Sequence, residues 1–107
     1  MSGINDREKG FENKFAHDQE LEFKAAARRN KLLGLWAAEL MGLDGEAAAE
    51  YAKSVIVADF EEAGDDDVFR KVRGDLDARN VDLSDHLLRK QMDDLLATAR
   101  QQIQAEG

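Results

Sequence analysis

The densest group of side chains with chemical potential is a run of acidic residues between positions 59 and 67. Its members are Asp59, Glu61, Glu62, Asp65, Asp66 and Asp67. The run lacks the D-x-[DN]-x-[DN]-G spacing of a calcium-binding loop. Three Asp residues at the start of a helix are explained by capping and by the helix dipole. We therefore predict a structural role for the run and no metal site.

The two histidines, His17 and His86, are the remaining candidates for metal binding or catalysis, because the chain has no cysteine. Neither histidine belongs to an H-E-x-x-H or E-x-x-H motif, and carboxylate metal sites in four-helix proteins need two of the latter. These side chains cannot supply a nucleophile, a base and an orienting group. The sequence therefore predicts a protein without catalytic residues, which is not an enzyme.

Basic side chains cluster at Lys24, Arg28, Arg29 and Lys31. In a helix, Arg28 shares a face with Lys24 or Lys31, so the cluster could hold a phosphate group. No glycine-rich phosphate loop accompanies it, so any nucleotide would be bound weakly and by side chains alone. The alternative is that these residues cover the bundle surface or contact a large protein partner.

The elements that position these residues are predicted to be helices only. The chain has no proline, is rich in Ala, Leu, Glu and Lys, and spaces its apolar residues three and four apart. We predict an all-α four-helix bundle with helices at about 18–42, 45–62, 66–79 and 84–103. The connections between them are only a few residues long, which favours neighbouring helices that fold back on one another.

Each predicted helix carries its own apolar stripe and end signals. The expected buried residues are Leu21, Ala25, Leu32, Leu35 or Trp36, and Leu40; Tyr51, Ala52, Val55, Ile56 and Phe60; Val68, Phe69, Val72 and Leu76; and Leu88, Met92, Leu95, Ala99 and Ile103. Asp44 and Ser84 are expected to cap the second and fourth helices, and Asn80 suits the left-handed turn after the third.

The first helix is longer than anything that could pack beside it. Residues 5–43 read as helix almost without interruption, which corresponds to roughly 58 Å, whereas each later helix reaches about 30 Å or less. The surplus carries Phe11 and Phe15, which lie one turn apart. An exposed aromatic pair on a charged helix is most simply explained by a partner protein.

Residues 1–17 are therefore predicted to form a flexible N-terminal arm, and residues 18–107 the bundle. Asn5 with Glu8 makes a capping box, while Asp18 offers a second start for the helix. Gly10 costs about 1 kcal/mol in a helix interior, and so short a segment is marginal alone. We expect the arm to fray when free and to fold when bound; an ordinary disordered terminus is the alternative.

The net charge of −8 is unevenly distributed. Up to Gly34 the chain has seven basic and six acidic residues, whereas the remainder has eight basic and seventeen acidic. Such an acidic body is repelled by phosphate backbones and anionic lipid, so nucleic acid is not expected as a partner. No segment approaches the ~20 apolar residues of a membrane span. We expect a soluble, unprocessed chain that is monomeric when free and does not insert into a membrane.

Three longer blocks of sequence carry a family resemblance: KFAHD at 14–18, ARRNKLLGLW at 27–36 and DFEEAGDDDV at 59–68. Through these blocks nearly the whole chain resembles the zeta subunit of alphaproteobacterial F-type ATP synthase, a family of small four-helix inhibitors of ATP hydrolysis. The resemblance implies that the N-terminal arm enters an interface between catalytic subunits and the rotor and blocks rotation in the hydrolytic direction.

The resemblance also implies partners and a location. The partners would be the alpha, beta and gamma subunits of the catalytic sector, and the protein would be cytoplasmic, peripheral to the inner membrane through the synthase. Adenine nucleotide, ATP or ADP, becomes a candidate weak ligand, with no other cofactor. A helical regulatory module that binds adenine nucleotide and acts on another protein is the rival hypothesis.

Within the arm, Phe11 and Phe15 are the predicted apolar anchors. Three basic residues, Arg7, Lys9 and Lys14, are expected to pair with acidic groups on the enzyme, although simple solvation explains them as well. The remaining predicted contacts are Ile4, Asp6 and Glu8, of which Glu8 also serves the helix cap.

Overall fold

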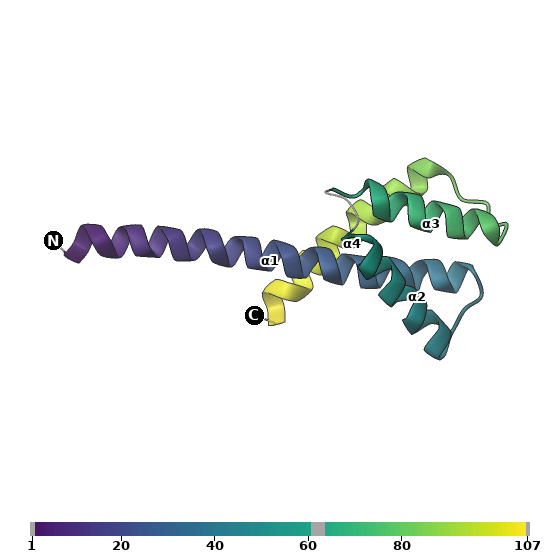
Figure 1. The fold of residues 1–107 in the computed structure, drawn as a ribbon, viewed down its shortest axis with the longest axis horizontal. Helices are drawn as coiled ribbons and strands as arrows, with labels where there is room; N and C mark the ends of the chain where they lie inside the picture. The colour runs from purple at the N-terminus through teal and green to yellow at the C-terminus, as the bar shows by residue number, and fades with distance from the viewer. Residues whose placement is uncertain (1, 61–63, 107) are drawn as a thin grey trace.

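The computed structural model describes residues 2–60 and 64–106, with side chains from Gln19 onward. These residues form four helices and no strand (Figure 1). The helices are α1 (Ser2–Leu40), α2 (Gly45–Ala58), α3 (Asp66–Ala78) and α4 (Asp85–Glu106). The predicted all-α, four-helix fold with a long first helix is confirmed.

The helix boundaries differ from the predicted ones in detail. α1 is one helix from Ser2 to Leu40, and it contains no break at the predicted bundle boundary near residue 18. α2 ends at Ala58, before the predicted end at 62, while α4 continues past 103 to Glu106. The predicted arm, residues 1–17, lies outside the residues whose side chains the structure describes, so its fraying and its contacts stay predictions.

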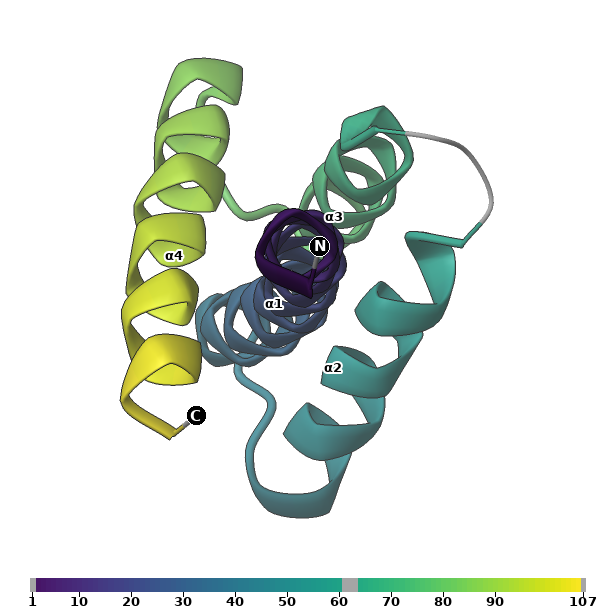
Figure 2. The same cartoon turned by 90° about the vertical axis from the view of Figure 1, so that its left-hand side faces the viewer.

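The long helix α1 occupies the centre of the bundle. Viewed along α1, the helices α4 and α2 lie on opposite sides of it, and α3 lies beside the C-terminal half of α1 (Figure 2). The main apolar cluster consists of Leu33, Ala37, Val55, Val68, Val72, Leu76, Leu88 and Met92. A smaller cluster of Ala25, Ala99 and Ile103 packs with Leu21, Leu32 and Leu96. In the described residues, α1 is thus held in the bundle from Leu21 onward, and its N-terminal part projects beyond it.

α1 and α2 approach each other most closely at Gly34 and Ala52. A Cβ atom added to Gly34 would lie 2.5 Å from the Cα atom of Ala52. Ala52 itself is 3% exposed, so two small residues bring the helix backbones into contact. Any larger side chain at position 34 would push α2 away from α1.

Three predicted end signals can be compared with the structure. Asn80 has φ 59°, which confirms the left-handed turn after α3. The Ser84 hydroxyl accepts a hydrogen bond of 3.1 Å from the amide of Leu87, which confirms the cap of α4. Asp44 stands at the N-cap of α2, but its side chain makes no capping hydrogen bond, so that prediction is wrong in its chemistry.

Several residues expected in the core are exposed. Phe60 is 71% exposed because α2 ends at Ala58, so the i+4 spacing from Ile56 no longer directs its ring toward α1. Leu40, in the last turn of α1, is 41% exposed. Of the alternatives Leu35 and Trp36, it is Trp36 that packs against the main cluster, although only partly buried. In the described part of the chain, no helix is both long enough and apolar enough to cross a membrane.

Candidate partner-binding surface

A buried polar network connects α1 to the segment between α2 and α3. Arg29 donates hydrogen bonds from Nε to Oδ1 of Asn30 (2.7 Å) and from Nη2 to Oδ1 of Asp65 (2.8 Å). Asn30 in turn donates from Nδ2 to Oδ2 of Asp59, at 2.9 Å. The two acidic residues that flank positions 61–63 are therefore both tied to consecutive residues of α1.

Charge compensation explains why an arginine is tolerated inside this small fold. Arg29 is 2% exposed, and its hydrogen bond holds the pKa of the Asp65 carboxyl below its usual range, against the opposing effect of burial. Buried charges are stable only when paired and hydrogen-bonded. The pair therefore stabilises the fold in which Arg29 and Asp65 meet.

The other described members of the acidic run also have structural partners. Asp66 accepts a hydrogen bond of 3.0 Å from Arg89 of α4, and Asp67 accepts one of 2.8 Å from the amide of Val68. The predicted capping by the side chains of this run is not observed at the N-cap, because Asp65 stands there without a side-chain capping hydrogen bond. The described carboxylates instead bond to Arg29, Arg89 and the Val68 amide. Among the described residues, no group of three or more His, Cys, Asp or Glu side chains could hold a metal ion.

A second polar cluster, on α2 and α3, is also structural. Tyr51 donates a hydrogen bond of 2.8 Å to Asp75, and Lys71 lies 3.0 Å from the same carboxylate and over the Tyr51 ring. Burial, followed by the hydrogen bond to Asp75, raises the pKa of Tyr51 far above its usual value. The phenol thus stays protonated and serves to join α2 to α3.

The predicted basic cluster is divided by the structure. Lys24, Arg28 and Lys31 line an open groove of about 470 Å³, as expected from their helical spacing. Arg29 lies outside this groove, because it points into the polar network with Asp65. The face predicted from the i, i+3 and i+4 positions is therefore real, and Arg29 is not part of it.

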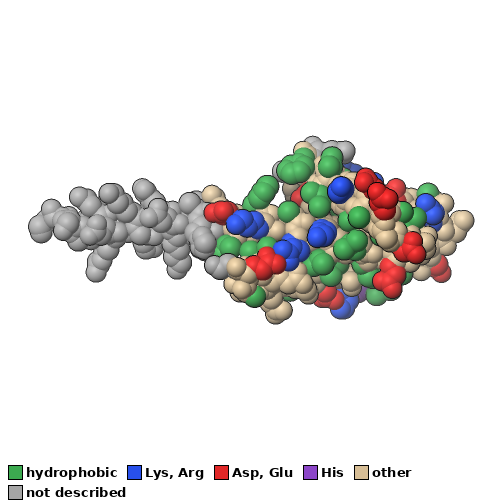
Figure 3. Space-filling view, turned by 90° about the horizontal axis from the view of Figure 1, so that it is seen from below, with side chains coloured by type: hydrophobic (Ala, Val, Ile, Leu, Met, Phe, Trp, Pro, Cys, Tyr) green, Lys and Arg blue, Asp and Glu red, His purple; other side chains and the backbone are tan. Residues whose placement is uncertain are grey.

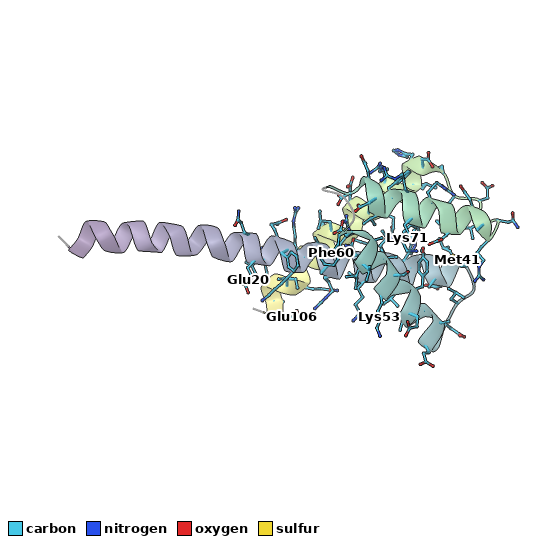
Figure 4. All side chains as sticks on the ribbon, viewed as in Figure 1. Glu20, Met41, Lys53, Phe60, Lys71 and Glu106 are labelled. Atoms are coloured by element: carbon cyan, nitrogen blue, oxygen red, sulfur yellow. The ribbon has the colours of Figure 1, made fainter. Side chains whose placement is uncertain are left out.

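The groove lies where α1 leaves the bundle, between α2 and the end of α4. Its apolar lining comes from Phe23 and Ala27 on α1, Ile56 on α2 and Ile103 on α4. A neighbouring hollow shares Phe23, Ala27 and Ile56 with it and extends to Phe60. In Figure 4, the labelled residues Phe60, Glu20 and Glu106 lie near the point where α1 leaves the bundle.

Ion pairs fix two of the three cations in the groove. Arg28 donates from Nη1 to Gln102 and from Nη2 to Glu106, both at 2.8 Å, which ties the end of α4 to α1. Lys24 lies 3.3 Å from Glu20, one turn away. Lys31 makes no ion pair with any residue that the structure describes.

We define the junction face by six residues that surround these two hollows: Phe23, Lys24, Arg28, Lys31, Ile56 and Phe60. Phe23 is 63% exposed and Phe60 71% exposed, which is unusual for two large aromatic side chains so close together. Figure 3 shows basic side chains in a row among hydrophobic ones next to the base of the arm, with a few acidic side chains beside them and more toward the opposite end.

Sequence reasoning did not identify the aromatic part of this face. Phe23 does fall outside the stripe formed by Leu21 and Ala25, and this signal was available from spacing alone. The sequence predicts Phe60 in the core, because the helix it predicts at 45–62 is longer than α2, which ends at Ala58. The predicted arm contacts, Ile4, Asp6, Arg7, Glu8, Lys9, Phe11, Lys14 and Phe15, lie outside the described side chains.

Comparisons with known proteins identify a family and a similar solved structure. A family model described as ATPase inhibitor subunit zeta matches residues 1–102. A protein solved by solution NMR is 48% identical, with a TM-score of 0.72; the alignment covers 81% of this chain and 99% of the other. No curated protein matches the chain significantly.

Proposed function

The chain belongs to the ATPase inhibitor subunit zeta family, and from this premise we propose that it inhibits ATP hydrolysis by an F-type ATP synthase. Membership of an inhibitor family confirms the resemblance drawn from the sequence and supports a regulatory rather than a catalytic role. The proposed partners are the alpha, beta and gamma subunits of the catalytic sector, so the protein would be peripheral to the membrane through that enzyme.

The observation that carries the proposed mechanism is the projection of α1. The helix runs from Ser2 to Leu40 as one element, whereas in the described residues its packing begins at Leu21. A helix that continues from a packed segment needs no new nucleation. An isolated 17-residue peptide would have to form its first helical turn, which is unfavourable in free energy, when it binds. The body thus prepares the arm to become helical inside a narrow interface.

In the proposed mechanism, the arm inserts between catalytic and rotor subunits and blocks rotation in the direction of hydrolysis. Phe11 and Phe15 would be the apolar anchors, because buried aromatic side chains dominate binding energy at interfaces. Arg7, Lys9 and Lys14 would pair with acidic groups of the enzyme, which affects the association rate more than the affinity.

Deletion of residues 1–17 tests the proposal. The core begins at Leu21, so we expect the shortened chain to keep its helical bundle and its cooperative unfolding while losing inhibition of the purified catalytic sector. Circular dichroism and an ATPase assay on the same preparation measure both properties. Loss of cooperative unfolding would mean that the arm belongs to the fold, and full inhibition by the shortened chain would contradict the role of the arm.

A weaker proposal concerns adenine nucleotide, for which the groove offers Lys24, Arg28 and Lys31 beside the ring of Phe23. Phosphate oxygens would meet the cations, and the adenine ring would stack on the aromatic side chain. Titration of the full chain with ATP, followed by amide chemical shifts, tests it. Shifts confined to the residues that line the groove, in 23–31, Ile56, Ile103 and Glu106, are expected. Their absence at millimolar ATP would exclude nucleotide as a ligand of this groove.

A further inference from the structure

We propose that the junction face is a second docking surface, which binds an acidic amphipathic helix exposed on the outside of the catalytic sector. This inference rests on the proposed function, since it assigns a second contact to the same partner. The arm would supply inhibition, and the junction face would supply additional affinity and position the arm at its point of entry.

The first argument is the concentration of apolar surface. Phe23 is 63% exposed and Phe60 71% exposed, and both line the hollow that adjoins the groove. α1 and α2 already contact each other through two small residues, Gly34 and Ala52. The large exposed rings are therefore not needed to hold these two helices together. Contiguous apolar surface with a polar rim is typical of an interaction site.

The second argument is charge complementarity. The chain carries a net charge of −8, yet the described residues that line the groove include three cations and one carboxylate, Glu106, which is already bonded to Arg28. The adjoining hollow adds one carboxylate, Asp59, which is bonded to Asn30. Lys31 has no ion pair within the described residues. An incoming segment with Asp and Glu at its edges would satisfy Lys31 and compete with Glu20 for Lys24. The face therefore favours an acidic partner over a neutral or basic one.

The third argument is the shape of the surface. The groove of about 470 Å³ is bounded by α1, α2 and α4, and the adjoining hollow continues it toward Phe60. An open groove between helices that is lined by both apolar and charged side chains suits an amphipathic helix that places residues i, i+3 or i+4, and i+7 into it. A peptide in extended conformation would find no sheet edge here, because the described residues contain no strand.

The fourth argument is continuity with the arm. Phe23 follows Phe15 by eight residues, which is two i+4 steps along the same helix. An enzyme that holds the arm would thus have the junction face directly outside its entry point. Linking two contacts on one rigid helix makes the second association intramolecular, and such linkage raises affinity by about 10²- to 10⁴-fold in favourable cases.

The test compares substitutions on the junction face with matched substitutions elsewhere, all in the full chain. Phe23→Ser with Phe60→Ser removes the aromatic surface, and Lys31→Glu reverses the unpaired charge. Leu87→Ser, at a residue 50% exposed on α4, is the apolar control, and Lys90→Glu, also on α4, has the same charge change as Lys31→Glu. Thermal unfolding of every variant checks that the bundle is intact.

Two quantities are measured with the purified catalytic sector: the inhibitor concentration for half-maximal inhibition and the residual ATPase activity at saturation. The junction variants should need a concentration about 10- to 100-fold higher and reach the same residual activity. The two α4 controls should match the unmodified chain. Raising the salt concentration should weaken inhibition by the unmodified chain more than inhibition by Lys31→Glu, because salt screens an electrostatic attraction that this variant already lacks.

Three other outcomes would overturn the inference, and a fourth would overturn the proposed function. If the junction variants and their controls need the same concentration for half-maximal inhibition, the proposed inhibition stands and the second docking surface is ruled out. If the unmodified chain sediments as a dimer and Phe23→Ser sediments as a monomer, the face binds a second copy of the chain. If Lys31→Glu loses ATP binding while its concentration for half-maximal inhibition stays the same, the junction face binds nucleotide. If the unmodified chain binds the catalytic sector through this face but does not inhibit, the proposed function fails instead.

Discussion

The guanidinium of Arg29 and the carboxylate of Asp65 meet at 2.8 Å, although the first side chain is 2% exposed and the second 50% exposed. The two residues are separated by 36 positions, and their bond joins α1 to the start of α3. The asymmetry in burial means that the two partners are not equivalent. Removing the carboxylate leaves a buried cation, whereas removing the cation leaves a carboxylate that water can solvate.

Asp65→Asn should therefore destabilise the bundle. Breaking a fully buried pair typically costs about 3 to 5 kcal/mol, and because water screens half of this carboxylate we expect about 1 to 3 kcal/mol. Urea unfolding measures the difference. Asp66→Asn is the matched control, because its pair with Arg89 is exposed and should contribute at most about 1 kcal/mol. Equal effects of the two substitutions would mean that the burial of Arg29 has no energetic importance.

The same pair predicts a dependence on pH. Arg29 lowers the pKa of Asp65 in the folded state, so the unfolded chain binds a proton at this site more readily. The stabilisation by Asp65 is therefore complete above the ordinary carboxyl pKa of about 3.9 and is lost as the pH falls through the lower folded value. The difference in unfolding free energy between the unmodified chain and Asp65→Asn should shrink between pH 5 and pH 2, as followed by urea unfolding. A difference that is constant over that range would contradict this account.

Gly34→Ala tests the close approach of α1 and α2. Helix propensity alone favours Ala over Gly by about 1 kcal/mol, but the new methyl group would lie 2.5 Å from the backbone of Ala52. We expect a net loss of about 1 to 3 kcal/mol, because overpacking forces the helices apart. Gly74→Ala in α3 is the control, since a Cβ atom there meets nothing within 4 Å, and it should stabilise by up to about 1 kcal/mol. If Gly34→Ala stabilises the bundle as much as Gly74→Ala, α2 can shift away from α1 without loss of stability.

Much of the fold was predictable because helix periodicity and end signals act locally. The stripes Val68–Val72–Leu76 and Leu88–Met92–Ala99 were predicted from spacing and are buried, and Asn80 and Ser84 end and begin their helices as expected. The roles of Arg29 and Asn30 were not predictable in this way. Their partners Asp65 and Asp59 are remote in sequence, and spacing along one helix says nothing about such distant contacts.

The candidate site was predicted in part. Lys24, Arg28 and Lys31 share a face because they belong to one helix, and local geometry determines that. The exposure of Phe60 depends on where α2 ends, and helix ends are the least certain part of any pattern. The aromatic contribution of α2 to the junction face therefore required the three-dimensional structure.

The arm anchors are tested by replacing Phe11 and Phe15 together with Ala. This change removes the aromatic residues and leaves the charges and the packed core from Leu21 onward untouched, so stability should be unchanged. The predicted cap at Asn5 plays no part here, because α1 already begins at Ser2. If each anchor contributes about 2 kcal/mol to binding, the concentration for half-maximal inhibition should rise by about 10²- to 10³-fold. Asn13→Ala, between the two anchors, is the matched control and should inhibit normally. Undiminished inhibition by the double variant would exclude the aromatic residues as anchors.

The direction of the block gives the mechanism its most specific test. A wedge between catalytic and rotor subunits that opposes rotation in one sense need not oppose the other, whereas a ligand that fills an active site stops both reactions. In membrane vesicles that carry the coupled enzyme, the full chain should suppress ATP hydrolysis much more strongly than proton-driven ATP synthesis, and Phe11→Ala with Phe15→Ala should abolish the difference by relieving hydrolysis. Assays of both reactions at the same inhibitor concentration decide the matter. Equal suppression of hydrolysis and synthesis would replace the wedge by a plain block of the active site, with the arm still as the inhibitory element.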